Sequence, residues 1–145
     1  MDRIDRAMLL KMMDDDQDQE TQNQAVDLAK KDENIEFWIQ PDGYKYSWDN
    51  CARVIIEKKD KELAPYMSLL LKWLQDLNWP GALLVLECLK HVEPKFIIRD
   101  LEKTINEATQ NNDLAWIEFL SELTESKTIL EGLDENVKKT LLDLK

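Results

Sequence analysis

Four aspartates near the N-terminus are the densest group of metal-ligating or acid–base side chains in the sequence. Asp14, Asp15, Asp16 and Asp18 lie in the polar run DDDQDQETQNQ. Carboxylate oxygens bind divalent cations, but this run lacks the glycine and the closing glutamate of an EF-hand loop. We therefore expect a solvated acidic loop that holds no metal.

Other groups for catalysis are scarce. His91 is the single histidine, Cys51 and Cys88 are the only cysteines, and three glycines leave little scope for a phosphate-binding loop. The motifs of serine hydrolases, P-loop proteins, dinucleotide-binding folds and zinc proteases are missing. We expect a protein that is not an enzyme and uses no cofactor. A carboxylate-based hydrolase stays open as an alternative, because a sequence does not reveal which acids meet in space.

Aromatic residues are the second chemical resource, and five of them are tryptophans. Tryptophan and tyrosine are favoured both in helix packing and at protein-binding hot spots. An aromatic group flanks the turn signal Pro41-Asp42-Gly43 and consists of Phe37, Trp38, Tyr44, Tyr46 and Trp48. We predict that this group forms a contact surface; the rival interpretation is a plug for one end of the core. Trp73 lies off the apolar face of its helix, which leaves core and surface both open.

The element that best positions these residues is the stretch 63–92, which reads as two helices and a tight turn. Its first half places apolar side chains on one helix face: Leu63, Met67, Leu70, Leu71 and Leu74. The turn consists of Asp76, Asn78, Trp79 and Pro80, where Asn78 is expected to cap the second helix and Pro80 to stand in its first turn. Trp79 is expected to fasten the two helices together. Such a short link makes an αα-hairpin.

Composition and weak internal repeats extend this pattern to the whole chain. Three glycines, four prolines and 34% charged residues favour helix over sheet. Alanines followed by apolar residues at helical spacing recur at 25, 52, 82 and 115, which are 27, 30 and 33 residues apart. This spacing is close to the length of one helix-turn-helix repeat. We expect an all-α fold, with residues 1–145 in a single helical-repeat domain and 1–46 as a less regular N-terminal extension.

The stretch LLLKWLQDLNWPGALLVLECLK resembles an uncharacterised bacterial family of small helical domains, domain of unknown function 5071. The resemblance rests on a leucine-rich helix, the turn L-Q-D-x-N-W-P and an alanine in the second helix: Leu74, Gln75, Asp76, Asn78, Trp79, Pro80 and Ala82. It implies a HEAT-like α-α superhelix of about four to five helical hairpins and carries no established activity. Similar small helical-repeat domains occur beside toxin genes as immunity proteins.

Negative charge is concentrated at the two ends of the sequence. The net charge is −11; residues 1–50 hold 13 acidic and 6 basic side chains, 51–92 hold 5 and 6, and 93–145 hold 12 and 7. Such a field repels nucleic acid and anionic lipid and steers a basic protein inward. The simpler interpretation is that the negative charge only keeps the protein soluble. We expect a cytoplasmic location, because the sequence has no apolar run near the roughly 18 residues of a membrane span and no signal-peptide pattern.

These observations lead to one hypothesis, a non-enzymatic acidic protein-binding module. Its most concrete form is a bacterial immunity or inhibitor protein that masks a basic partner such as a toxin. A structural adaptor or a self-associating repeat protein is the alternative, and the sequence leaves the oligomeric state open. The predicted partner-binding residues are Asp14, Asp15, Asp16, Asp18, Phe37, Trp38, Tyr44, Tyr46 and Trp73.

Overall fold

The protein is all-α, as expected: the structure, a computed structural model, describes residues 5–143, and no strand occurs among them. The helices are α1 (Arg6–Met12), α2 (Gln19–Ala29), α3 (Trp48–Ile55), α4 (Asp60–Leu63), α5 (Met67–Lys72), α6 (Ala82–Lys90), α7 (Ile98–Gln110), α8 (Leu114–Ser121), α9 (Lys127–Gly132) and α10 (Glu135–Leu142). Short 3₁₀ turns extend or join them at Glu36–Trp38, Lys45–Ser47, Ala64–Tyr66, Trp73–Gln75, Pro94–Phe96 and Glu122–Glu125. Within residues 5–143, no helix combines the length and apolar character needed to cross a bilayer.

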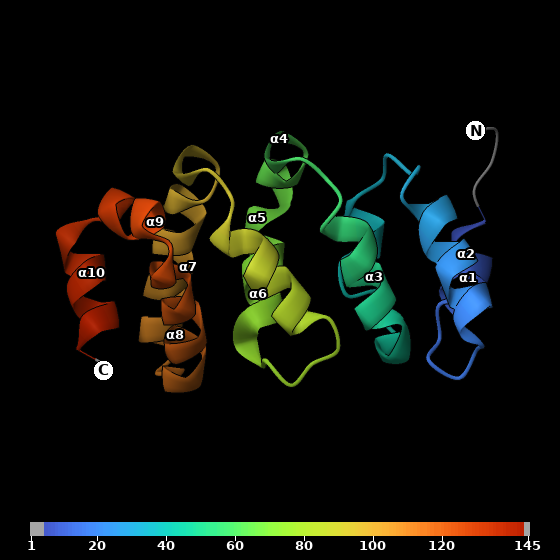
Figure 1. Ribbon diagram of the computed structural model, residues 1–145. Coiled ribbons are helices and arrows are strands. Elements are labelled where there is room, and N and C mark those ends of the chain that lie inside the picture. The colour runs from blue at the N-terminus through green and yellow to red at the C-terminus, as the bar shows by residue number, and fades with distance from the viewer. Residues whose placement is uncertain (1–4, 144–145) are drawn as a thin grey trace.

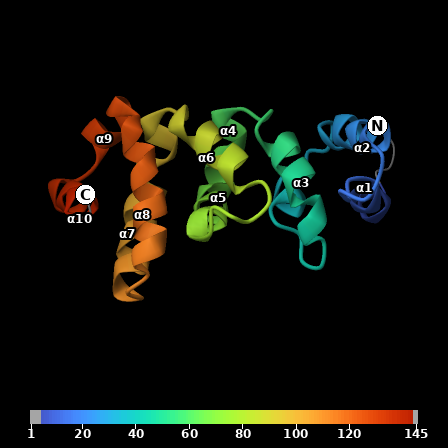
Figure 2. The same cartoon turned by 60° about the horizontal axis from the view of Figure 1, so that its bottom comes forward.

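The helices stand side by side in one row, from α1 and α2 at one end to α10 at the other (Figure 1). Because the chain runs up and down along this row, its connections lie at two opposite edges. The segments 13–18, 41–49, 76–81 and 110–113 lie one after another along the lower edge of Figure 1, which Figure 2 turns toward the viewer. Loops from distant parts of the sequence therefore share one edge of the molecule.

A continuous apolar core fills the space between the helices. The five apolar residues predicted for the first half of the central hairpin are all 0% exposed: Leu63, Met67, Leu70, Leu71 and Leu74. They do not share one helix as predicted, because Leu63 ends α4, the next three lie in α5, and Leu74 lies in the following 3₁₀ turn. Burial of a leucine or methionine side chain contributes about 1.5–3 kcal/mol. Trp116 of α8 is also buried and donates its indole N–H to the carbonyl oxygen of Leu71 at 3.1 Å. The apolar face of α5 is thereby tied to α8.

The central turn is present, but its capping differs from the prediction. α6 begins at Ala82, and Gly81 precedes it in the left-handed conformation with φ +83°. Asn78 therefore does not cap α6, and Pro80 lies before its first turn. The backbone N–H of Gly81 instead donates to Oδ1 of Asp49, in α3, at 2.6 Å. A carboxylate from a neighbouring helix thus satisfies an amide at the start of α6, which local sequence could not show.

Residues 5–46, the N-terminal segment, dock on the start of α3 through buried polar contacts. The hydroxyl of Ser47 donates to the carbonyl oxygen of Leu10 at 2.7 Å. The amide of Asn50 donates to the carbonyl oxygen of Met13 at 2.7 Å and to the side-chain oxygen of Gln22 at 2.9 Å. These bonds cover carbonyl groups at the end of α1, and Leu10 also accepts the backbone N–H of Met13 there at 3.2 Å. The segment therefore continues the row of helices.

Candidate protein-binding surface

Acidic residues outnumber basic ones in the four connections that lie along the lower edge of the row in Figure 1. We name the aspartates of these connections the acidic edge: Asp14, Asp15, Asp16, Asp18, Asp42, Asp49, Asp76 and Asp113. All eight are exposed or half-exposed, and Lys45 is the only base in these segments, which gives a net charge of −7. Asp14, Asp15 and Asp16 are adjacent in the sequence, whereas Asp42, Asp49, Asp76 and Asp113 come from other connections and are placed at the same edge by the fold.

The opposite edge has a different electrostatic character. Its connections are the segments 30–34, 56–62, 90–95 and 122–127 (Figure 1). They contain eight acidic and eight basic side chains, so their charges balance when the histidine is neutral. Charge is therefore polarised across the molecule, and a cationic partner is attracted toward one edge.

The carboxylates of Asp14, Asp15 and Asp16 form a tight cluster in which every ligand oxygen lies within 4.8 Å of the others. Desolvation, and then repulsion from Asp14, Asp16 and Asp49, raises the pKa of Asp15 above its usual value. An approaching cation would relieve this repulsion. No second feature of the described loop points to a metal ion, and we assign no metal site.

Four other aspartates of the acidic edge also support the fold, and one of them, Asp113, is the N-cap of α8 and accepts the backbone N–H of Trp116 at 3.1 Å. Asp18 is the N-cap of α2 and accepts the backbone N–H of Thr21 at 2.8 Å, which lowers the pKa of Asp18. Asp76 accepts the backbone N–H of Asn78 at 2.8 Å within the central turn, and Asp49 accepts that of Gly81. A substitution that probes charge at these positions must therefore preserve the hydrogen-bond acceptor.

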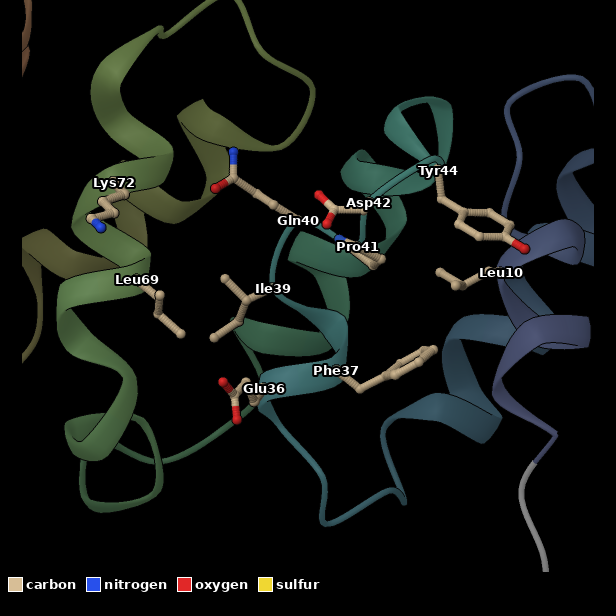
Figure 3. A pocket seen from close by; sticks show the side chains of 10 residues that line it. All are labelled: Leu10, Glu36, Phe37, Ile39, Gln40, Pro41, Asp42, Tyr44, Leu69 and Lys72. Carbon is tan, nitrogen blue, oxygen red and sulfur yellow. The ribbon is translucent and has the colours of Figure 1, made fainter.

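A pocket of about 510 Å³ lies where the N-terminal segment meets α5 (Figure 3). Its apolar walls come from three elements: Leu10 of α1, Phe37, Ile39, Pro41 and Tyr44 of the irregular segment before α3, and Leu69 of α5. Glu36, Gln40, Asp42 and Lys72 supply polar groups. The guanidinium carbon of Arg6 lies 5.6 Å from the centroid of the Phe37 ring and helps to hold that ring in place.

The predicted aromatic contact group is divided by the structure. Phe37 and Tyr44 are half-buried in the walls of the pocket, and Tyr46 is 66% exposed. Trp48 is half-buried and makes edge-to-face contacts with Trp73 and Trp79, with ring centroids 6.2 and 6.0 Å apart. Trp79 therefore packs against α3.

Trp38 and Trp73 are fully buried, so the prediction that they contact a partner is wrong. Trp38 donates its indole N–H to Asp32 at 3.1 Å, and Trp73 donates to the carbonyl oxygen of Pro80 at 2.9 Å. α5 ends at Lys72, and the following 3₁₀ turn has three residues per turn. This 3₁₀ turn, Trp73–Gln75, packs against both α6 and α8, so Trp73 is enclosed although it lies off the face predicted from α-helical spacing.

Sequence reasoning missed the pocket residues contributed by the flanking helices. Leu10 and Leu69 are 59 positions apart, and each is an ordinary apolar residue of an amphipathic helix. Lys72 is an ordinary surface base by its local sequence. No local pattern marks these three residues, because the pocket arises only when α1 and α5 flank the segment that contains Phe37.

The family model of a domain of unknown function, DUF5071, matches residues 47–144. The chain belongs to this family. The match confirms the resemblance noted at the central turn and extends it from the start of α3 to the C-terminal helices. No curated protein and no solved structure matches the chain. The N-terminal segment, with most of the pocket walls, precedes the DUF5071 region.

Proposed function

We propose that this DUF5071 protein is a non-enzymatic module that binds a basic protein through its acidic edge. In this proposal residues 1–145 form one helical-repeat domain, a HEAT-like α-α superhelix whose loops present the binding surface. The row of helices with connections at two opposite edges supports this architecture. Loops on a rigid helical scaffold are favourable places for binding residues.

The observation that carries the proposal is the polarity of charge between the two edges. Net charge is −7 at the acidic edge and zero at the opposite edge. Charges within about 8 Å of one another act together at physiological ionic strength, and the Asp14, Asp15 and Asp16 cluster lies well inside that range. A basic protein would be steered to this edge and would bind more weakly as salt is added.

The most concrete form of the proposal is a bacterial, cytoplasmic immunity or inhibitor protein that masks a cationic toxin. Proteins that bind nucleic acid do so largely through lysine and arginine contacts to phosphates. A line of carboxylates along one edge offers such a surface an alternative set of anions. The inhibitor would then compete with nucleic acid for the same basic groups.

The test compares three baits in a lysate of the native host. The first is the wild-type protein. The second replaces Asp14, Asp15, Asp16 and Asp18 with Asn, which keeps the N-cap acceptor. The third is a charge-matched control with Gln at four exposed acidic positions outside the acidic edge: Glu33, Glu107, Glu118 and Glu131. Captured proteins are eluted by a salt step and identified by mass spectrometry.

We expect a basic protein that the wild type and the control retain and the Asn variant loses. The purified partner should then lose its own activity when mixed with one equivalent of the wild-type protein. Equal capture by the acidic-edge variant and the control would reject this binding surface. Capture of no basic protein by any bait would reject the function.

A further inference from the structure

We infer that the pocket in Figure 3 receives an extended segment of the partner in which a lysine or arginine stands beside an apolar side chain. This inference rests on the proposed function, because it assigns the anchor point of the same basic partner. The acidic edge provides long-range attraction, whereas the pocket provides a fixed docking position.

The apolar walls account for the apolar part of the occupant. A volume of about 510 Å³ falls within the range of sites that hold small ligands or a few side chains. Phe37 and Tyr44 contribute rings on the side of α1, and Leu69 contributes its side chain from α5 (Figure 3). Each of these three residues is only half-buried, so part of its apolar surface remains to be covered. An apolar side chain in the pocket would cover it.

The carboxylates account for the basic part of the occupant. Glu36 and Asp42 line the pocket, and Lys72 is the single base there. Within residues 5–143, the side chains of Glu36 and Asp42 form neither an ion pair nor a hydrogen bond. A guanidinium or ammonium group can therefore pair with either carboxylate without breaking an existing contact.

The position of the pocket connects it to the proposed binding surface. Asp42 belongs both to the acidic edge and to the pocket lining, so the two surfaces are continuous. Residues before 47 supply all of the lining except Leu69 and Lys72. The N-terminal segment, which precedes the DUF5071 region, thus completes the pocket and determines which side chains fit.

The experiment uses the ¹⁵N-labelled full chain and the peptide acetyl-Leu-Arg-Leu-amide as probe. The matched control is acetyl-Leu-citrulline-Leu-amide, which has nearly the same shape but no charge. We expect amide shifts at Ile39, Gln40 and Leu69, with the arginine peptide binding about threefold or more tightly than the citrulline peptide. Shifts scattered over the surface, or equal binding of the two peptides, would overturn the inference.

Four variants separate the pocket from the overall charge. Lys72→Gln should strengthen binding of the arginine peptide by about two- to fivefold, whereas Lys127→Gln, which changes the net charge equally at an exposed position outside the pocket, should not. Leu69→Gln should weaken binding by about fivefold or more, since it places a polar group on an apolar wall. Tyr44→Ala should also weaken binding. Unchanged circular dichroism will show that each variant is folded.

The remaining outcomes distinguish failure of the pocket from failure of the proposed function. If the captured partner binds Leu69→Gln as tightly as wild type but loses affinity for the Asp→Asn variant, the pocket assignment is wrong and the function stands. If the peptide binds the pocket but no bait captures a basic protein, the function is wrong. A dimer in sedimentation that Leu69→Gln dissociates would place a second copy in the pocket and overturn the inference.

Discussion

Arg6 and Asp32 form a two-pronged ion pair that fixes the start of α1 to the residues after α2. Arg6 Nε lies 2.6 Å from Asp32 Oδ2, and Arg6 Nη2 lies 2.9 Å from Asp32 Oδ1. Asp32 is only 3% exposed and also accepts hydrogen bonds from the indole of Trp38 at 3.1 Å and the backbone N–H of Asn34 at 3.0 Å. A buried carboxylate is tolerated here because several donors replace its water.

Replacing Arg6 with Gln should destabilise the protein at neutral pH, because it leaves the carboxylate of Asp32, which is only 3% exposed, without its cation. Asp32→Asn in the same chain removes that charge. The double variant should therefore be more stable than Arg6→Gln alone. Urea unfolding followed by tryptophan fluorescence measures the four free energies of the cycle. If the loss of unfolding free energy in the double variant equals the sum of the losses in the two single variants, Arg6 and Asp32 have no coupling energy.

The stability contributed by Asp32 should depend on pH. The hydrogen bond from Arg6, opposed by desolvation, holds the pKa of Asp32 below its usual value. The folded state thus favours the carboxylate, so the contribution is complete above the unfolded pKa of about 3.9 and is lost as pH falls through the folded pKa.

The measurement is the difference in unfolding free energy between wild type and Asp32→Asn at a series of pH values. We expect it to be constant between about pH 7 and pH 5 and to shrink below about pH 4. Asp18 also has a lowered pKa, but it is present in both proteins and its effect cancels. If the difference in unfolding free energy increased as the pH fell, the folded state would not favour the ionised form of Asp32.

Gly81 should be far less tolerant of a side chain than Gly43, although both have positive φ, +83° and +80°. A Cβ at position 81 would lie 2.7 Å from the backbone oxygen of Trp48, 2.8 Å from the Trp73 ring and 2.9 Å from the Ala52 Cβ. At position 43 it would meet nothing within 4 Å. We expect Gly43→Ala to cost about 1 kcal/mol and Gly81→Ala at least about 2 kcal/mol more.

Chemical denaturation of the two alanine variants tests this difference. The shared cost is that of a left-handed backbone, and the additional cost at position 81 comes from separating α6 from α3. Equal losses of unfolding free energy in the two variants would show that the turn can move away from Trp48 without destabilising the protein.

The parts of the fold that sequence reasoning predicted are those set by local periodicity. Met67 and Leu71 share a face of α5 because four residues make about one helical turn, whatever packs against them. The acidic loop and the ring at Phe37 were recognisable from residue type alone. The turn at Pro80 was recognisable because proline restricts its own backbone.

The parts that were missed depend on contacts between distant residues. Arg6 and Asp32 are separated by 26 positions, and nothing near either residue identifies its partner. Trp73 was misplaced because its burial depends on α6 and α8, which both pack against the 3₁₀ turn that begins with it. Leu69 lines the pocket only because the N-terminal segment folds back beside α5.

The two thiols should react at different rates with a disulfide reagent. Both cysteines are free; burial raises the pKa of the Cys51 thiol to about 12, and burial together with the nearby Asp60 raises that of Cys88 to about 11. Since the thiolate is the reactive form, both should be slow in the native protein at about pH 8. Cys88, which is half-buried, should react first, and Cys51 only after unfolding. The Cys51→Ala and Cys88→Ala variants assign the two phases, and a fast phase in Cys88→Ala would contradict this order.

Asn50 should control how firmly the N-terminal segment is attached to the DUF5071 region. Its side chain is 5% exposed and donates to Met13 and Gln22, while its oxygen accepts a hydrogen bond from Arg53 at 2.9 Å. Asn50→Ala leaves the carbonyl group of Met13 without this donor, at a cost of about 1–3 kcal/mol. The loss falls on the junction with α1 and α2 rather than on the distant helices.

Hydrogen exchange followed by mass spectrometry shows which helices are destabilised by Asn50→Ala. In Asn50→Ala, amides of α1 and α2 should exchange about tenfold or more faster, because a loss of about 1.4 kcal/mol multiplies the open population by ten. Amides of α7 and α8 should exchange at the wild-type rate if the N-terminal segment opens on its own. Equal acceleration in both regions would mean that the N-terminal segment and the DUF5071 region unfold as one cooperative unit. The pocket between them could then open only when the whole protein unfolds.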